Sequence, residues 1–203
     1  MGICYIVSAG DMYGDIPPIN SDDLLIAADA GYLHLQKLNV EPQILLGDFD
    51  SMDEPECRDL IRYPVMKDDT DTMLAIKLGF EKGYDEFVIY GALGGERTDH
   101  TVANIQSLAY IAQSGGKGTL IGKNEKFTVI KDSEIILESD VNKTFSVFAY
   151  GGNAEGVTIE GSLFDVENVE LSPLFPLGVS NKFKNNNVKI SVESGYLLVV
   201  YSL

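Results

Sequence analysis

Two aspartates separated by one residue, Asp48 and Asp50, follow the apolar run at residues 44–46 and Gly47. If that run is a strand, side chains two residues apart point to the same side, so the two carboxylates can converge just beyond its end. Glycine lets the backbone turn, or lets a ligand approach closely, at this point. Carboxylate oxygens at such a turn suit Mg²⁺, but an Asp-rich turn with its own side-chain hydrogen bonds explains these residues equally well.

Further acidic and polar residues follow the ends of other apolar runs in the first hundred residues: Asp29; Asp68, Asp69, Thr70 and Asp71; and Arg97, Asp99 and His100. Each group alone could be a helix N-cap or a solvated turn. At a single sheet edge, however, so many carboxylates would repel one another unless a cation compensated. Because Mg²⁺ typically takes one or two carboxylates and then substrate phosphates, a nucleotide is the expected third component.

A glycine-rich stretch at residues 91–95 precedes Arg97. Its backbone N–H groups could approach a phosphate at the start of the following helix. The stretch fits neither the P-loop nor the dinucleotide fingerprint, so a flexible connector is the alternative. The planar guanidinium of Arg97 suits a phosphate or a carboxylate, including that of Asp99. On position alone, His100 is expected to be a structural residue at the helix start and not a catalytic base.

Alternating strands and helices must position these residues. Strands are predicted at 4–8, 24–28, 43–46, 87–90 and 119–121, with an edge strand at 62–66, and helices at 32–38, 73–82 and 99–113. Asp29 is the predicted N-cap of the first helix. The predicted buried side of the last helix consists of Val102, Ile105, Leu108, Ala109 and Ala112.

This alternation implies an α/β domain with a mostly parallel, Rossmann-like sheet and helices on both faces. Ligands of such sheets bind outside the carboxyl ends of the strands, which is where the acidic groups fall. After residue 124 helical periodicity disappears. Short β-rich runs separated by Gly, Asn and Asp turns follow, at 127–130, 134–137, 144–149, 156–159, 188–192 and 196–201. We therefore predict two domains, 1–124 and an antiparallel β-sandwich at 125–203.

The composition excludes several classes of partner. The chain of 203 residues has 31 Asp and Glu against 15 Lys and Arg, a formal net charge of −16. Binding to nucleic acid rests on neutralising phosphates with Lys and Arg, so no nucleic-acid partner is expected. No apolar run is long enough for a membrane helix, and the start lacks the basic region of a signal peptide. Two cysteines are too few for a disulfide framework. These features predict a cytoplasmic protein with no membrane partner.

A set of motifs, in order along the whole chain, resembles that of the thiamine pyrophosphokinase family: Asp29-Ala30-Gly31, Gly47-Asp48-Phe49-Asp50-Ser51, Lys67-Asp68-Asp69-Thr70-Asp71, residues 91–100 with Asn104, and Gly178-Val179-Ser180-Asn181-Lys182-Phe183. The resemblance implies an α/β nucleotide-binding domain followed by a β-sandwich domain, and a homodimer. It also implies transfer of pyrophosphate from ATP to the hydroxyl of thiamine, leaving AMP, with Mg²⁺ as cofactor.

Carried over by position, the resemblance assigns roles to individual residues. The metal and phosphate acids fall on Asp29, Asp48, Asp50 and Asp71; of these Asp48, Asp50 and Asp71, with Arg97, are expected to carry catalysis. Binding of nucleotide or thiamine is further expected of Gly31, Asp68, Thr70, Gly94, Arg97, Asp99, His100 and Asn104. Ser180 and Asn181 fall on the β-domain turn that helps to bind thiamine across the dimer interface. Metal binding is the first role expected of Asp71, and acceptance of the hydroxyl proton the second.

This sequence departs from the family pattern in two ways. Ala30 stands where an Asp-Gly-Gly motif has glycine. The chain also has no Trp, so the aromatic residue that stacks on thiamine in some members of the family is expected to be either absent or replaced by Phe175 or Phe183.

The residues and the implied reaction agree chemically. Phosphoryl-type transfer requires mainly alignment and charge neutralisation, which acids, a metal and one arginine supply. Thiamine is a cation, and an acidic site attracts it. Three alternatives stay open: a haloacid-dehalogenase-like phosphatase with Asp48 as nucleophile, a nucleotide-sugar transferase, and a non-catalytic nucleotide or thiamine sensor. In the phosphatases the motif ends the first strand, whereas here two predicted strands precede it.

Overall fold

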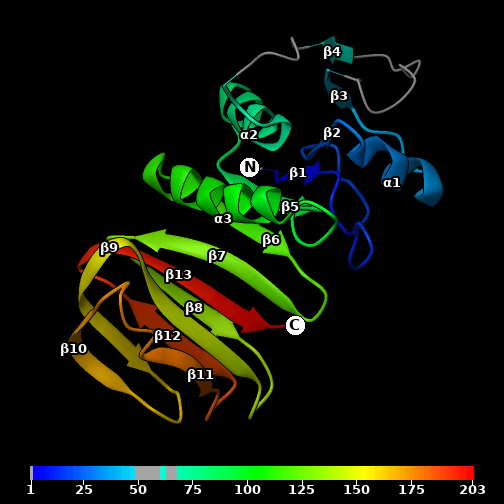
Figure 1. The fold of residues 1–203 in the computed structure, drawn as a ribbon. Coiled ribbons are helices and arrows are strands. Elements are labelled where there is room, and N and C mark those ends of the chain that lie inside the picture. The colour runs from blue at the N-terminus through cyan, green and yellow to red at the C-terminus, as the bar shows by residue number, and fades with distance from the viewer. Residues whose placement is uncertain (1, 49–59, 63–67) are drawn as a thin grey trace. The chain divides into compact units, whose positions relative to one another are not determined.

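The computed structural model describes residues 2–48, 60–62 and 68–203. The chain divides into two compact units, Met1–Lys123 (unit 1) and Asn124–Leu203 (unit 2) (Figure 1). No helix within these described ranges is long and apolar enough to cross a membrane.

Unit 1 is built on a parallel sheet with the strand order β4-β3-β2-β1-β5-β6. Its strands are β1 (Cys4–Val7), β2 (Leu24–Ala28), β3 (Ile44–Gly47), β4 (Leu60–Arg62), β5 (Glu86–Tyr90) and β6 (Lys117–Ile121). The strands β2, β3 and β4 extend the sheet on one side of β1, and β5 and β6 extend it on the other. The direction of strand order therefore reverses between β1 and β5, and such a switch point is where open α/β sheets bind ligands.

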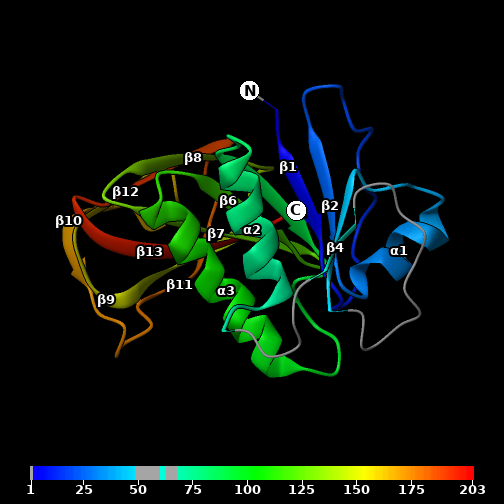
Figure 2. The same cartoon turned by 90° about the horizontal axis from the view of Figure 1, so that it is seen from above.

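Helices cover both faces of this sheet, as predicted. In Figure 2, α1 (Gly31–Leu38) lies on the opposite side of the strands from α2 (Asp71–Glu81) and α3 (Thr98–Gln113). Tyr32 and Leu35 of α1 pack with Tyr5 and Val7 of β1. On the other face, Gly79 of α2 lies against Phe87 and Cys4. Residues of β1 therefore contact helices on alternate faces, which explains why β1, β2 and β3 are apolar throughout.

The predicted cap of α1 is wrong. The N-cap residue is Ala30, which makes no side-chain cap hydrogen bond. Asp29 instead adopts a left-handed conformation with φ of 49°, and its backbone N–H donates to the Leu46 carbonyl at 2.7 Å. The neighbouring strand β3 thus supplies an acceptor for the Asp29 N–H, a contact that the local sequence does not reveal.

The predicted buried side of α3 is correct for Leu108 but wrong for Val102, which is 53% exposed. The buried residues of the helix are Asn104, Ser107, Leu108 and Ile111. Asn104 faces inward because its Nδ2 donates to the Ala92 carbonyl at 2.8 Å. Of the edge strand predicted at 62–66, only Arg62 lies among the described residues, as the end of β4.

Unit 2 consists of antiparallel strands: β7 (Glu125–Lys131), β8 (Glu134–Glu138), β9 (Thr144–Glu160), β10 (Val166–Leu171), β11 (Gly178–Lys182), β12 (Asn187–Ser191) and β13 (Ser194–Ser202). The predicted runs at 144–149 and 156–159 are the two ends of β9. Its first half pairs with β13 and β11, and its second half with β12 and β10. Apolar side chains from both halves form one core, which confirms the predicted sandwich.

Candidate active site

Three connections of unit 1 converge at the carboxyl end of β1. A Cβ atom added to Gly31, at the start of α1, would lie 2.0 Å from the Val7 carbonyl oxygen, and one added to Gly91 would lie 2.1 Å from that of Ser8. The hydroxyls of Ser8 and Thr72 are 2.8 Å apart, and both residues are buried. The starts of α1 and α2 and the loop before α3 are thereby held beside the switch point.

Asp29 and Asp48 follow the ends of the adjacent strands β2 and β3. A Cβ atom on Gly47 would lie 3.1 Å from the Asp29 Cα, so the two strand ends are in close contact at the residue before Asp48. Both aspartates are half-buried. Left-handed backbone of the kind seen at Asp29 is uncommon for a residue with a side chain and concentrates at functional sites. Ala30 has φ of −61° and ψ of −5°, which any L residue adopts, so alanine fits where the family has glycine. Asp50 lies outside the described residues.

The acids before α2 differ in their contacts. Thr70 is the N-cap of the helix, and its Oγ1 accepts the Met73 N–H at 3.2 Å. Asp71 occupies the first turn, where the helix dipole favours a negative charge. Asp69 pairs with Lys77 at 2.6 Å, whereas Asp68 is exposed. The site residues predicted here therefore start a helix that Thr72 attaches to β1.

The loop between β5 and α3 has positive φ at Gly91, Gly94 and Gly95, which favours glycine at all three positions. At its end, Arg97 Nη2 and Asp99 Oδ2 form an ion pair of 2.8 Å, and each side chain is about two-thirds exposed. The hydrogen bond from Arg97 holds the pKa of Asp99 below its usual value. His100 is exposed in the first turn of α3, as the sequence suggested. Asn104 lies beneath the loop, with its amide on the Ala92 carbonyl.

In unit 2 the side chain of Asn181 is buried, and both its oxygen and its nitrogen make two hydrogen bonds. Its Oδ1 accepts the N–H groups of Phe164 and Lys182, and its Nδ2 donates to the Phe164 carbonyl at 2.9 Å and the Ser162 hydroxyl at 3.1 Å. Ser180 is exposed, with φ of 60°. Asn181 therefore fixes the turn that presents Phe164, and Ser180 presents its side chain to the surface.

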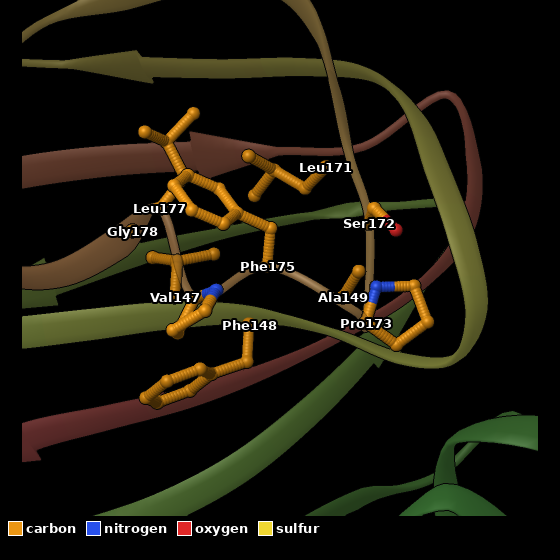
Figure 3. A pocket seen from close by; sticks show the side chains of 10 residues that line it. Val147, Phe148, Ala149, Leu171, Ser172, Pro173, Phe175, Leu177 and Gly178 are labelled. Carbon is orange, nitrogen blue, oxygen red and sulfur yellow. The ribbon is translucent and has the colours of Figure 1, made fainter.

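The two candidate aromatic residues for thiamine differ in accessibility. Phe183 is 1% exposed and packs on Phe145, with ring centroids 5.3 Å apart, so the expectation that it stacks on a ligand is wrong. Phe175 is 66% exposed. It belongs to the loop between β10 and β11, which lines a hollow together with Val147, Phe148 and Ala149 of β9 (Figure 3).

The acids of unit 1 fit a magnesium ion shared with a nucleotide. Residues 2–48, 60–62 and 68–203 contain no group of three or more His, Cys, Asp and Glu side chains that could hold a metal together. Mg²⁺ commonly takes only one or two carboxylates and completes its octahedron with phosphates and water. The hard oxygens of Asp29 and Asp48, at adjacent strand ends, match that donor set.

Sequence reasoning did not assign a role to Asp11, Tyr13, Ser8 or Thr72. A signal for Asp11 was present, since a Gly-Asp pair follows β1 after two small residues, much as Gly47 and Asp48 stand at the end of β3. Asp11 contacts the glycine loop and Tyr13. The Ser8–Thr72 pair joins residues 64 positions apart and has no local signature.

The fold and the site define an α/β protein that binds its ligand at the carboxyl edge of a parallel sheet and carries a second, antiparallel β unit. The profile of the family described as thiamin pyrophosphokinase, catalytic domain, matches residues 18–119. That described as thiamin pyrophosphokinase, vitamin B1 binding domain, matches residues 132–197. The chain belongs to the thiamin pyrophosphokinase family.

Individual relatives agree. The thiamine pyrophosphokinase of Bacillus subtilis (strain 168) is 29% identical over 187 residues, which cover 88% of this chain and 87% of the relative. A crystal structure of the Bacillus subtilis enzyme has a TM-score of 0.89 at 26% identity and covers 98% of both chains. The yeast enzyme, at 18% identity, shares the fold with a TM-score of 0.75, over 100% of this chain and 86% of its own.

The reaction of the chain is thus the transfer of pyrophosphate from ATP to the hydroxyl of thiamine, giving thiamine diphosphate and AMP. Membership of this enzyme family excludes the phosphatase and sugar-transferase interpretations that the Asp-x-Asp motif had left open, and the separate interpretation as a non-catalytic sensor.

Proposed function

We propose that the reaction depends on Mg²⁺ and takes place at the carboxyl edge of the unit 1 sheet. Asp29, Asp48, Asp50 and Asp71 are the proposed acids for the metal and, through it, the ATP phosphates. The single observation that carries this proposal is the close contact between Asp29 and Gly47, because it brings two carboxylate-bearing residues to adjacent strand ends near the switch point. A bound Mg²⁺ would neutralise phosphate charge and align the transferred group.

The side chains of this chain have complementary parts in the proposed reaction. The thiamine hydroxyl oxygen attacks the β-phosphorus of ATP, and the bond from that phosphorus to the oxygen bridging to the α-phosphate breaks, so that AMP leaves. Arg97 binds phosphate, with its orientation fixed by the ion pair to Asp99. The glycine loop offers main-chain N–H groups. Asp71 contributes to metal binding first, and it accepts the proton of the thiamine hydroxyl only as a secondary role.

Thiamine binding is proposed to involve unit 2, through Ser180 and Phe175. The match of residues 132–197 to a vitamin B1 binding domain supports this assignment. The exposed ring of Phe175 can stack on a flat cationic ligand, which the buried ring of Phe183 cannot. Asn181 acts through the turn that it fixes and not by direct contact, because its amide is already engaged.

A homodimer is proposed from the exposed apolar surface of unit 2. Its members are the exposed large apolar residues at positions 163–179: Leu163, Phe164, Leu174, Phe175, Leu177 and Val179. These six exposed side chains fall within 17 consecutive positions of the chain, and large exposed apolar patches mark interaction sites in soluble proteins. The proposed compartment is the cytoplasm, where ATP is the available pyrophosphate donor.

The reaction and its metal requirement are tested together. The purified chain is incubated with ATP, thiamine and Mg²⁺, and nucleotides and thiamine esters are separated chromatographically. AMP and thiamine diphosphate are expected in equal amounts, with loss of both after chelation by EDTA and recovery on addition of Mg²⁺. ADP as the only nucleotide product would contradict pyrophosphate transfer, and full activity in EDTA would contradict the metal role.

A further inference from the structure

The glycine loop of unit 1 is joined to the end of β1 by a ladder of hydrogen bonds. Backbone N–H groups of Ser8, Gly10 and Asp11 donate to the carbonyls of Tyr90, Gly91 and Leu93, at 2.9, 2.7 and 3.0 Å. These contacts continue the pairing of β1 and β5 beyond their ends, at the switch point where a ligand of this fold is expected. The conformation of residues 91–95 therefore depends on the segment that follows β1.

The last contact of this ladder is made by a side chain. The carboxylate of Asp11 accepts the Tyr13 hydroxyl at 2.9 Å from Oδ2, and it lies close enough to the Gly95 N–H to be stabilised by that group. Together these donors lower the pKa of Asp11, the Gly95 N–H contributing most, and the same bond raises the pKa of Tyr13. The carboxylate is therefore ionised at neutral pH, and these contacts weaken only as the pH falls through that lowered pKa.

Gly94 and Gly95, at the end of the loop, both lie close to Asp11. Gly94 and Gly95 have φ of 71° and 78°, and a Cβ atom on Gly94 would lie 2.4 Å from Asp11 Oδ2. The other side of the segment is also held, because His34 Nε2 donates to the Gly10 carbonyl at 2.8 Å. Tyr13 and His34 thus restrict the segment on two sides, so that the Asp11 carboxylate meets the loop in one arrangement.

We propose that Asp11 is a positioning residue for the reaction: its carboxylate, oriented by Tyr13, fixes the main chain of Gly94 and Gly95 in the conformation that receives the ATP phosphates. The inference rests on the proposed function, which places those phosphates at the glycine loop. Because the Asp11 carboxylate contacts the Gly95 N–H, Asp11 shapes the loop and does not itself contact the nucleotide. Loss of the hydrogen-bond acceptor at this position, as distinct from loss of its charge, should impair nucleotide binding while leaving thiamine binding intact.

The test compares Asp11→Ala with Asp11→Asn, and uses Asp15→Ala as a matched control in the same segment. Asn retains an oxygen that accepts the Gly95 N–H and an amide that can donate to the Tyr13 hydroxyl, but it has no charge. Asp11→Ala is expected to raise KM for ATP about tenfold, with KM for thiamine and kcat within about twofold. Asp11→Asn and Asp15→Ala are expected to stay near the wild-type values.

A second measurement does not require turnover. Amide hydrogen exchange in the free protein should be faster at residues 91–97 in Asp11→Ala, and unchanged in Asp11→Asn and Asp15→Ala. Unchanged exchange in Asp11→Ala would overturn the inference. A lower KM for ATP in either Asp11 variant would also overturn it, because it would mean that the carboxylate repels the nucleotide. If the wild-type chain released ADP instead of AMP, the proposed function would fail, while the exchange comparison would still decide whether Asp11 orders the loop.

Discussion

Neighbouring acids before α2 have different surroundings, and this difference separates a structural role from a proposed catalytic one. Asp69 pairs with Lys77, and the two side chains are 33% and 39% exposed. Salt bridges at the protein surface contribute about 0–1 kcal/mol to stability, and this pair is partly exposed. Asp71, in contrast, starts α2 directly before Thr72, whose hydroxyl contacts Ser8 at the end of β1. The position of Asp71 is therefore determined by the sheet.

Asp71→Asn is expected to lower turnover about 100-fold, because the variant removes one of the charges proposed to hold the metal and the phosphates. The same change at Asp69 removes the partly exposed ion pair to Lys77, so Asp69→Asn is expected to keep at least half of the wild-type turnover. AMP release under saturating ATP and thiamine measures both variants. Near-normal turnover in Asp71→Asn would refute the role in metal binding and the role as a base together.

Site residues differ in how far the sequence could predict their surroundings. Asp29 and Asp48 follow apolar strands, so their place at adjacent strand ends could be anticipated from the alternation of elements. The hydrogen bonds of Asn181 could not, because they depend on which backbone groups a distant turn leaves without partners. Likewise the sequence does not show whether Phe175 or Phe183 is accessible to a ligand. The packing of Phe183 on Phe145 distinguishes the two.

Among the elements, β1 and α2 are joined by one buried contact between hydroxyl groups. Ser8 is 4% exposed and Thr72 is 7% exposed, and their oxygens are 2.8 Å apart. A buried hydroxyl that loses its partner costs about 1–3 kcal/mol, whereas removal of both partners can be nearly neutral. The pair therefore offers a clean measure of how firmly the start of α2 is attached to the sheet.

We expect Ser8→Ala and Thr72→Val each to destabilise the chain by about 1–2 kcal/mol, because each leaves one buried hydroxyl without its partner. The double variant is expected to cost less than the sum, with a coupling energy of about 1 kcal/mol. Urea denaturation followed by circular dichroism provides the three values. Strict additivity would show that the two hydroxyls do not interact in solution.

The glycine loop allows a second comparison at this scale, between two glycines of similar backbone. Gly94 and Gly115 have φ of 71° and 81°, so alanine strains the backbone by about 1 kcal/mol at either position. An added Cβ meets Asp11 at Gly94, but meets nothing within 4 Å at Gly115. Gly94→Ala is therefore expected to raise KM for ATP at least about tenfold, whereas Gly115→Ala leaves it unchanged. Equal effects in steady-state assays would mean that strain alone, and not the loop's shape, matters.

Element prediction succeeded where apolar patterning was strong. Strands of the parallel sheet are buried on both faces and therefore appear as continuous apolar runs. The strands β10 and β11 were missed, since most of their side chains are exposed and their apolar residues show no clear alternation. On α3, periodicity placed Val102 inside, but the need to satisfy the Ala92 carbonyl turns Asn104 inward instead.

At the scale of the whole molecule, the two units differ in what their surfaces offer. The acids proposed for catalysis belong to unit 1, whereas the exposed apolar residues at 163–179 belong to unit 2. Leu174 is the most exposed large apolar residue among those described, at 92%. A chain with a net charge of −16 would otherwise repel copies of itself, so association requires an apolar contact of this kind.

Leu174→Asp is expected to convert the proposed dimer to a monomer, because it places a charge in the apolar contact. Val102→Asp, at a position 53% exposed on α3 of unit 1, serves as the matched control and is expected to keep the dimer mass. Light scattering coupled to size-exclusion chromatography measures both masses. A monomeric wild-type chain at micromolar concentration, or a dimeric Leu174→Asp variant, would contradict the assignment.

The long strand β9 has a consequence for how unit 2 folds. Its first half pairs with β13, where Phe145 lies opposite Tyr201, and its second half pairs with β12, where Ile159 lies opposite Ile190. Neither sheet can therefore form completely until chain segments far apart in sequence have paired with β9. Topologies dominated by such distant pairings fold in about milliseconds to seconds, much more slowly than helical domains. Because both sheets share one strand, we expect them to appear and disappear together, as one cooperative transition.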